Sequence, residues 1–166
     1  ISGRLIKSCI AIKDPKEKPD TQHWELSKFS LSSQSNAAAA LDWLERENFD
    51  NSQCWVSGFS FGSLIAMQLL MRRPEINRFI AISPQPNAYD FSFLSPCPTS
   101  GLMIYGKKDE LVPFEYINEL NKRLSSQKGI KVEFQSVQDA NHFFSKNENS
   151  LVKELNKYIK KETALY

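Results

Sequence analysis

In the stretch WVSGFSFGS, residues 55–63, Ser60 lies between two different hydrophobic patterns. The residues leading to Gly58 form a short, continuous apolar run, which is typical of a buried strand in a sheet covered on both faces. The residues after Gly62 continue as SLIAMQLLMRR, which predicts a buried helix over 63–73. Ser60 therefore lies at a tight turn from a strand into a helix, within the pattern Gly-x-Ser-x-Gly.

Strands and helices alternate along the rest of the chain. Strands are predicted at 53–57, 77–83, 101–106 and 130–137. Helices are predicted at 37–48, 63–73, 114–126 and 150–161. Because this alternation favours right-handed crossovers between parallel strands, the sequence predicts an α/β fold. We expect three layers, αβα, around a mostly parallel sheet.

Local signals set the expected ends and inward faces of the helices. Ser35 or Asn36 can cap the first helix. The candidate inward positions of that helix are Ala38, Leu41, Trp43 and Leu44. Pro113 suits the first turn of the third helix, because its missing N–H costs nothing there. The pattern Ser145-x-x-Glu148 is a candidate capping box for the last helix.

The amino-terminal part of the chain has weaker patterns than the rest. Residues 5–12 are compatible with one strand, and 14–22 contain two prolines and mixed charges, as a loop does. Residues 29–35 are serine-rich and weakly patterned. We therefore expect a leader segment over 1–34 and the regular domain over 35–166.

Composition limits the class of protein. A chain of 166 residues with 41% apolar residues is long enough for one packed domain. The net charge of +2 gives no reason to expect nucleic acid or a membrane as a partner. We expect no signal peptide, and no apolar run approaches the ~20 residues needed to span a bilayer. Cys9, Cys54 and Cys97 form no C-x-x-C pair, which argues against disulfides and zinc and favours reduced thiols in a cytoplasmic protein.

The turn at Ser60 has the features of a nucleophile elbow. Glycines on both sides allow a strained backbone in a narrow space. The helix that follows points its N–H groups at the serine, and the N–H of Phe61 is placed to donate to a developing oxyanion. A turn that merely connects a strand to a helix is the alternative. Because serine alone is a weak nucleophile, the catalytic interpretation requires a base elsewhere in the chain.

Partners for Ser60 follow two later strands. The order expected after such an elbow is serine, acid, histidine. His142 is the one histidine downstream of the serine, and Asp109, with Glu110 beside it, is the favoured acid. Asp139 is a less favoured acid because it lies in the histidine's own loop. Since loops at the carboxyl edge of a parallel sheet converge, Asp109 would orient His142 and His142 would deprotonate Ser60.

With these residues the sequence resembles the α/β-hydrolase superfamily, and most closely its small bacterial members related to dienelactone hydrolases. The similar stretches are AAAALDWLE, CWVSGFSFGSLIAMQLLMRRPEI, NAYDFSFLSPCP, GLMIYGKKDELVP and DANHFF. The resemblance begins at about residue 36 and implies Ser60 as nucleophile, Asp109 as acid and His142 as base. It also implies a small-molecule acyl substrate, an acyl-enzyme, and neither a metal nor an organic cofactor. Esterase, peptidase and acyltransferase activity all remain open.

The amino-terminal part departs from the family pattern. In such hydrolases several strands precede the elbow, and a loop with a His-Pro or His-Gly signature supplies a second oxyanion N–H. Gly3 is the only glycine before Gly58, and no such motif is present. We expect the first strands to be lacking and one oxyanion donor to be missing, at a cost of ~10²–10³ in rate. The apolar strand 53–57 would then need cover from residues 5–12, a missing amino-terminal portion or another chain.

The loop over 84–94 is apolar and follows a strand. Three residues of this loop, together with Phe59, are candidates to line a substrate pocket. They are Pro86, Tyr89 and Phe91. Packing of these aromatic side chains onto the sheet is an equal alternative.

The rival functional hypothesis is a truncated or split hydrolase, catalytically impaired, that acts as an association module or homo-oligomer.

Overall fold

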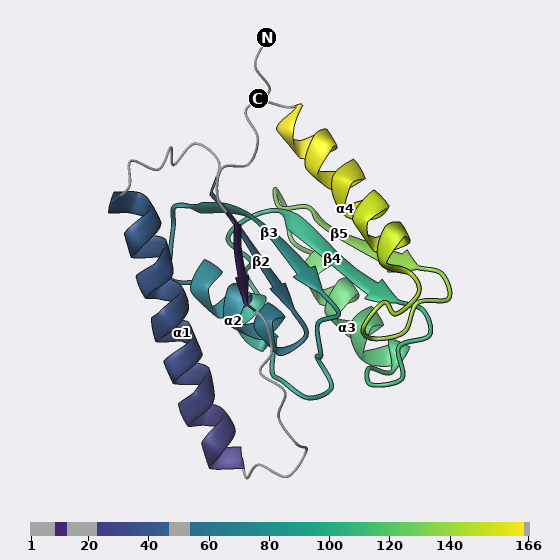
Figure 1. Ribbon diagram of the computed structural model, residues 1–166, viewed down its shortest axis with the longest axis horizontal. Helices are drawn as coiled ribbons and strands as arrows, with labels where there is room; N and C mark the ends of the chain where they lie inside the picture. The colour runs from purple at the N-terminus through teal and green to yellow at the C-terminus, as the bar shows by residue number, and fades with distance from the viewer. Residues whose placement is uncertain (1–8, 13–22, 47–53, 165–166) are drawn as a thin grey trace.

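The computed structural model of the protein describes residues 9–12, 23–46 and 54–164, and these ranges form a parallel sheet flanked by helices (Figure 1). The strands are β1 (Cys9–Ile12), β2 (Cys54–Phe59), β3 (Ile76–Ile82), β4 (Gly101–Gly106) and β5 (Val132–Val137). The helices are α1 (His23–Arg46), α2 (Phe61–Leu70), α3 (Phe114–Ser125) and α4 (Glu148–Thr163), with a 3-10 turn η2 (Ser92–Leu94).

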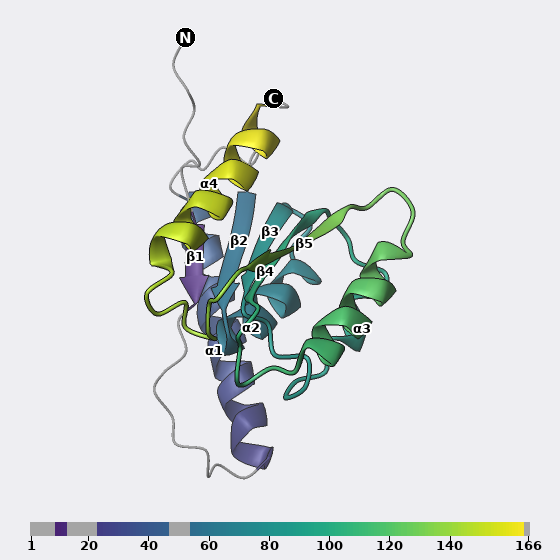
Figure 2. The ribbon, with the colours of Figure 1, turned by 90° about the vertical axis from the view of Figure 1, so that its right-hand side faces the viewer.

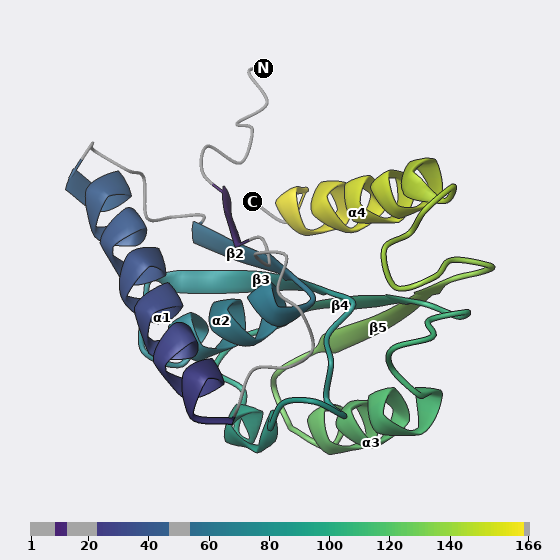
Figure 3. The same cartoon turned by 60° about the horizontal axis from the view of Figure 1, so that its bottom comes forward.

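The five strands lie in chain order, β1-β2-β3-β4-β5, and each pair is parallel. Right-handed crossovers between strands in this order all fall on the same face of the sheet. Accordingly, α1, α2 and α3 cover one face, whereas α4, which follows the last strand, covers the other (Figure 3). Figure 2 shows α3 and α4 on opposite sides of the sheet. The predicted α/β class and three-layer arrangement are confirmed.

Hydrophobic cores lie on both faces of the sheet. Val56 and Phe79 pack with α1, α2 and α3, while their neighbours Trp55 and Ile80 pack with α4. Successive residues of a strand point to opposite faces, so a strand covered on both sides is apolar at every position. This double coverage explains the continuous apolar runs in the sequence. Within the described ranges, no helix is both long and apolar enough to cross a bilayer.

The first helix is longer than predicted. α1 begins at His23 rather than after a cap at Ser35 or Asn36, and Ser35 lies inside it, donating its hydroxyl to the Leu31 carbonyl. Serine has only a moderate helix propensity, so residues 29–35 carry little local signal. Packing of the helix on α2 outweighs that weak propensity, for example through the side-chain hydrogen bond between Gln34 and Gln68.

The expected inward position of Trp43 is wrong. Ala37 and Leu41 are buried, one turn apart, and they define the face of α1 that contacts the core. Trp43 lies two residues after Leu41, roughly on the opposite side of a helix with 3.6 residues per turn, and is 58% exposed. Ala38 packs at the margin of the core, as expected.

The predicted capping box of the last helix is also wrong. Asn147 occupies the N-cap position of α4 and makes no side-chain cap hydrogen bond. The Glu148 carboxylate instead accepts from the Lys146 N–H at 3.3 Å, while the Ser145 N–H donates to the Asn141 side chain. The chain therefore enters α4 through a turn that the pattern Ser-x-x-Glu does not encode.

A strand from the amino-terminal part does cover β2. β1 pairs along it, with Ile10 opposite Val56 and Ile12 opposite Gly58, whereas residues 5–8 of the predicted strand lie outside the described ranges. β2 is therefore an inner strand, and β1 is the end of the sheet that the structure describes. The elbow serine thus follows a strand that is hydrogen-bonded on both sides.

Candidate catalytic site

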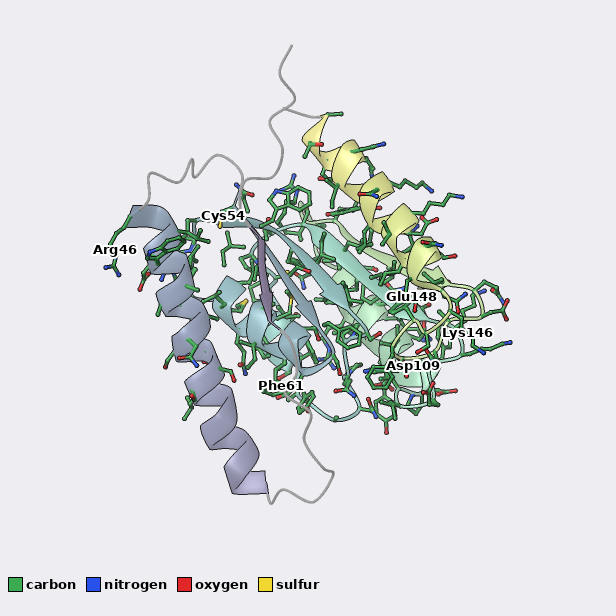
Figure 4. All side chains as sticks on the ribbon, viewed as in Figure 1. Arg46, Cys54, Phe61, Asp109, Lys146 and Glu148 are labelled. Atoms are coloured by element: carbon green, nitrogen blue, oxygen red, sulfur yellow. The ribbon has the colours of Figure 1, made fainter. Side chains whose placement is uncertain are left out.

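The carboxyl ends of the strands meet at one edge of the sheet. Phe59 at the end of β2 pairs with Ile82 at the end of β3, so the segments that follow begin side by side. Figure 4 shows Phe61 and Asp109 near this edge, away from Cys54 at the start of β2. The predicted site residues therefore come from loops that share one end of the fold.

Ser60 forms a strained turn that is fixed on both sides. Its φ of 53° and ψ of −121° are rare for a residue other than glycine. Its N–H donates to the Ile82 carbonyl at 2.8 Å, and its own carbonyl accepts from the Ser63 N–H at 3.0 Å and the Ser63 hydroxyl at 2.6 Å. Phe61 begins α2, so its backbone N–H lies at the positive end of the helix.

Gly58 allows β2 and α2 to approach each other at this turn. A Cβ atom at Gly58 would lie 2.0 Å from the Gly62 carbonyl oxygen and 2.7 Å from the Ser63 nitrogen. Real Cβ atoms do not come so close to backbone atoms. The first glycine of the Gly-x-Ser-x-Gly pattern is therefore a steric requirement of the elbow.

His142 connects Ser60 to Asp109. Its Nε2 lies 2.9 Å from Ser60 Oγ, and its Nδ1 lies 2.8 Å from Asp109 Oδ2. With the proton on Nδ1, the ring donates to the carboxylate and accepts from the serine hydroxyl. The imidazole is 0% exposed, and the other two side chains are also buried. Burial away from water strengthens both hydrogen bonds, so the three predicted residues form one connected array.

The Asp109 carboxylate is fixed through both oxygens. While Oδ2 faces His142, Oδ1 accepts from the N–H groups of Leu111 at 2.9 Å and Val112 at 3.0 Å. Asp139, the alternative acid, lies exposed on the surface and forms an ion pair with Lys108 at 2.8 Å. Asp109 is therefore the carboxylate that contacts the imidazole.

The loops that carry the acid and the histidine are joined through their backbones. The Lys108 N–H donates to the Ala140 carbonyl at 2.9 Å. A Cβ atom at Gly106 would lie 2.3 Å from that same carbonyl oxygen, so only glycine permits the approach. Glu110 lies farther out, with its carboxylate 3.5 Å from the His142 N–H. The two loops are thus in direct backbone contact.

Ser83 also belongs to this edge, and the sequence patterns did not single it out. It directly follows β3, and its hydroxyl donates to the His142 carbonyl at 2.8 Å. Its only sequence signal is a small polar residue at the carboxyl end of an apolar strand, which occurs in many loops. The contact joins positions 59 residues apart, so local patterns do not reveal it.

Two aromatic rings, those of Phe59 and Phe143, pack against the imidazole of His142. The ring centroid of Phe59 lies 5.7 Å from that of His142, and that of Phe143 lies 5.1 Å from it at nearly a right angle. Phe59, a predicted pocket residue, therefore packs directly against the imidazole of His142. Phe143 is 59% exposed, so it forms the outer rim of the site.

The other predicted pocket residues line a cavity that Ser60, Asp109 and His142 do not line. Pro86, Tyr89 and Phe91 line a small cavity of about 80 Å³ against α3, which neither Ser60 nor His142 lines. Phe91 is buried in the core, as packing of the loop onto the sheet requires. The Tyr89 ring meets the Phe61 ring edge-on at 5.5 Å, and so links this loop to the elbow. A role of these residues in substrate binding stays a prediction.

One known protein family and one curated protein are similar in sequence to this chain. The sequence model of the dienelactone hydrolase family matches residues 9–165. An uncharacterised protein from Rickettsia prowazekii is 45% identical over 128 residues, which are 75% of this chain and 54% of that protein. The match with the family includes residues 9–35, where the sequence patterns had shown no resemblance.

Solved structures share the fold. A protein of unknown function from Agrobacterium tumefaciens, described as an α/β hydrolase, has a TM-score of 0.76 and 48% identity over 78% of this chain and 60% of its own. An α/β serine hydrolase homologue from Coxiella burnetii has a TM-score of 0.69 and 27% identity, over 78% and 59%. The chain thus spans between 54% and 60% of the length of these relatives.

Proposed function

The chain belongs to the dienelactone hydrolase family, and from this premise we propose that it is a serine hydrolase acting on an ester or related acyl bond. The observation that supports this most strongly is the path from Ser60 Oγ through His142 to Asp109, with separations of 2.9 and 2.8 Å. A nucleophile, a base and a carboxylate that orients the base, all within hydrogen-bond reach, are the requirements for an activated serine.

The proposed reaction has two halves. As Ser60 Oγ attacks the acyl carbon, His142 Nε2 takes the hydroxyl proton, and Asp109 stabilises the imidazolium that forms. The C–O bond to the leaving group breaks, and His142 returns the proton to it, which leaves an acyl-enzyme. His142 then takes a proton from water, the hydroxide attacks the acyl carbon, and Ser60 recovers its proton as the carboxylic acid departs.

The negative oxygen of the tetrahedral intermediates would be stabilised at the start of α2. The N–H of Phe61 lies at the positive end of that helix, next to the nucleophile. The family resemblance places a second donor in a loop before the elbow strand, and the expected cost of lacking it is ~10²–10³ in rate. We therefore propose slow turnover for this chain alone.

The rim of the site favours a small-molecule substrate with an apolar acyl group. Phe143, beside the base, and Leu111, beside the acid, are both exposed large apolar side chains. Nucleophile, base, acid and N–H donor all come from the chain, so the proposed reaction needs neither a metal nor an organic cofactor. Analysis of the products would separate ester hydrolysis from peptidase and acyltransferase activity.

Labelling with a fluorophosphonate tests the proposal directly, because such probes react with activated serines. We expect covalent labelling of the native protein and none after heat denaturation, since the denatured chain separates Ser60 from His142. The measurement is fluorescence of the labelled band on a denaturing gel. If a cooperatively folded sample remains unlabelled, the proposed serine chemistry is wrong.

Asp109→Asn is expected to slow both labelling and ester hydrolysis by about 10⁴-fold, because the amide favours the wrong tautomer of His142. Asp139→Asn is the matched control, since that exposed carboxylate contacts Lys108 and not the imidazole. Initial rates with p-nitrophenyl acetate provide the measurement. Equal rates for the two variants would show that Asp109 is not the acid.

A second candidate function, an association module, is supported by the open side of β1. Within the described ranges this strand pairs only with β2, and an unpaired edge is a template for another strand. We propose that a second copy or an amino-terminal portion pairs there. A monomer by light scattering, with a cooperative melt, would count against association between copies.

A further inference from the structure

We propose that Ser83 is a positioning residue that holds His142 within hydrogen-bond distance of Ser60, an inference that rests on the proposed catalytic role of these two residues. Ser83 is 1% exposed and lies just past the end of β3. Its hydroxyl donates to the backbone carbonyl of His142 at 2.8 Å. The contact is therefore to the main chain of the histidine and leaves its ring free for Ser60 and Asp109.

The end of β3 holds both the nucleophile and the base. Ile82 accepts a hydrogen bond from the Ser60 N–H at 2.8 Å, and the next residue, Ser83, binds the His142 carbonyl. The Ser83 N–H in turn donates to the Ile104 carbonyl of β4 at 2.8 Å. Ile82, the last residue of an inner strand, and Ser83, which follows it, thus set the distance between the backbones that carry Oγ and Nε2.

Asp109 and Ser83 control different motions of the histidine. Asp109 binds Nδ1 and so fixes the rotation of the imidazole ring. Ser83 binds the main chain and so fixes where the ring is attached. The His142 N–H has only a long contact of 3.5 Å with the Glu110 carboxylate, so it restrains the backbone less. Loss of the Ser83 hydroxyl would therefore let the attachment point of the ring shift, which moves Nε2 away from Ser60 and weakens the contact between Nδ1 and Asp109.

The backbone at Ser83 gives a second reason to assign the hydroxyl a role. Its φ of 45° is in the left-handed region, which glycine adopts without strain and serine does not. Backbone geometry alone would thus favour glycine. The side chain occupies this strained position and donates its hydrogen bond to the main chain of the base.

Two substitutions at Ser83 distinguish the effect of losing the hydroxyl from the effect of backbone strain. Ser83→Ala removes the hydroxyl and keeps the Cβ atom, whereas Ser83→Gly removes it and suits the positive φ. The matched control is Thr99→Val, because the buried Thr99 hydroxyl donates to the Asn77 carbonyl at 2.6 Å, at the opposite end of β3. All three variants lose a hydroxyl-to-carbonyl hydrogen bond, but only two of them lose it at the histidine.

We expect Ser83→Ala and Ser83→Gly each to lower the rate of fluorophosphonate labelling by about 10²-fold, the scale of an ångström-sized misplacement. Thr99→Val should keep the wild-type labelling rate. If Ser83→Gly labels as fast as wild type, the hydroxyl has no positioning role and the inference is wrong.

Nuclear magnetic resonance of the imidazole supplies a readout that does not depend on turnover. The chain has two histidines, so His23→Gln leaves only the signals of His142. We expect the Nδ1 proton to exchange slowly with water in this background and in Thr99→Val, and to exchange faster in both Ser83 variants. Unchanged exchange in the Ser83 variants would overturn the inference. An unlabelled wild type with faster exchange in these variants would refute the proposed function and leave the positioning role supported.

Discussion

Ser60→Ala is expected to abolish fluorophosphonate labelling and to lower the rate of ester hydrolysis by at least about 10⁴-fold. Ser60 Oγ is the atom that would form the acyl bond, and His142 Nε2, 2.9 Å away, would have no hydroxyl to deprotonate. The fold should persist, because the backbone hydrogen bonds that fix the turn do not involve the hydroxyl. Initial rates with p-nitrophenyl acetate, together with a thermal melt, provide the measurement.

Ser57→Ala is the control for this variant. Ser57 is a half-buried serine of the same strand, three residues before the elbow, and it should keep the wild-type rate. Substantial hydrolysis by Ser60→Ala would point to another nucleophile. An equal loss in both variants would mean that damage to β2, and not removal of the nucleophile, slows the reaction.

Gly58→Ala is expected to have the largest effect on stability. The new methyl group would lie 2.0 Å from the Gly62 carbonyl oxygen, and its closest neighbours are all backbone atoms at the buried start of α2. Since backbone atoms cannot change rotamer, β2 and α2 must separate, which we expect to cost more than about 3 kcal/mol of the free energy of unfolding. Urea denaturation followed by circular dichroism measures this loss, and failure to fold would agree with it.

Gly129→Ala separates this steric effect from backbone preference. Gly129 has a φ of 80°, and a Cβ atom added there would meet no atom within 4 Å, so its substitution introduces strain without a clash. We expect a loss of roughly 1–2 kcal/mol. If Gly58→Ala costs no more than Gly129→Ala, the close approach at the elbow does not determine the stability of this turn.

The three polar site residues could be predicted because each follows a strand with a clear pattern. Ser60 follows β2, Asp109 follows β4 and His142 follows β5, and parallel strands bring their carboxyl ends to one edge. The sequence favoured Asp109 over Asp139, because Asp139 lies in the same loop as His142. The structure distinguishes them by contact, since Asp139 pairs with Lys108 on the surface.

The features of the fold and of the site that the sequence did not predict depend on tertiary contacts. Serine-rich residues near the start of α1 are helical in the structure despite moderate propensities, and the exposure of Trp43 follows from which face of α1 meets the core. Ser83 and Gly106 matter because loops distant in sequence approach each other there. The local periodicity of hydrophobic residues does not reveal contacts between segments so far apart in the sequence.

The site is assembled from part of the fold that its relatives contain. Ser60, Asp109 and His142 all come from β2 to β5 and the segments after them, although the chain spans only 54% to 60% of the relatives' length. The hydrogen bonds within this edge connect β2, β3, β4 and the histidine loop to one another. We therefore expect the geometry of the three residues to depend mainly on these strands, and the rate to depend also on the second oxyanion donor.

We propose that Ser60 forms a covalent acyl-enzyme. The most direct test mixes the protein with p-nitrophenyl acetate, stops the reaction in acid within the first turnover, and locates the acetyl group by peptide mass spectrometry. We predict one acetyl group per chain, on the peptide that contains Ser60, and none at that position in Ser60→Ala. Hydrolysis without any acetylated Ser60, or an acetyl group carried by a different residue, would contradict this claim.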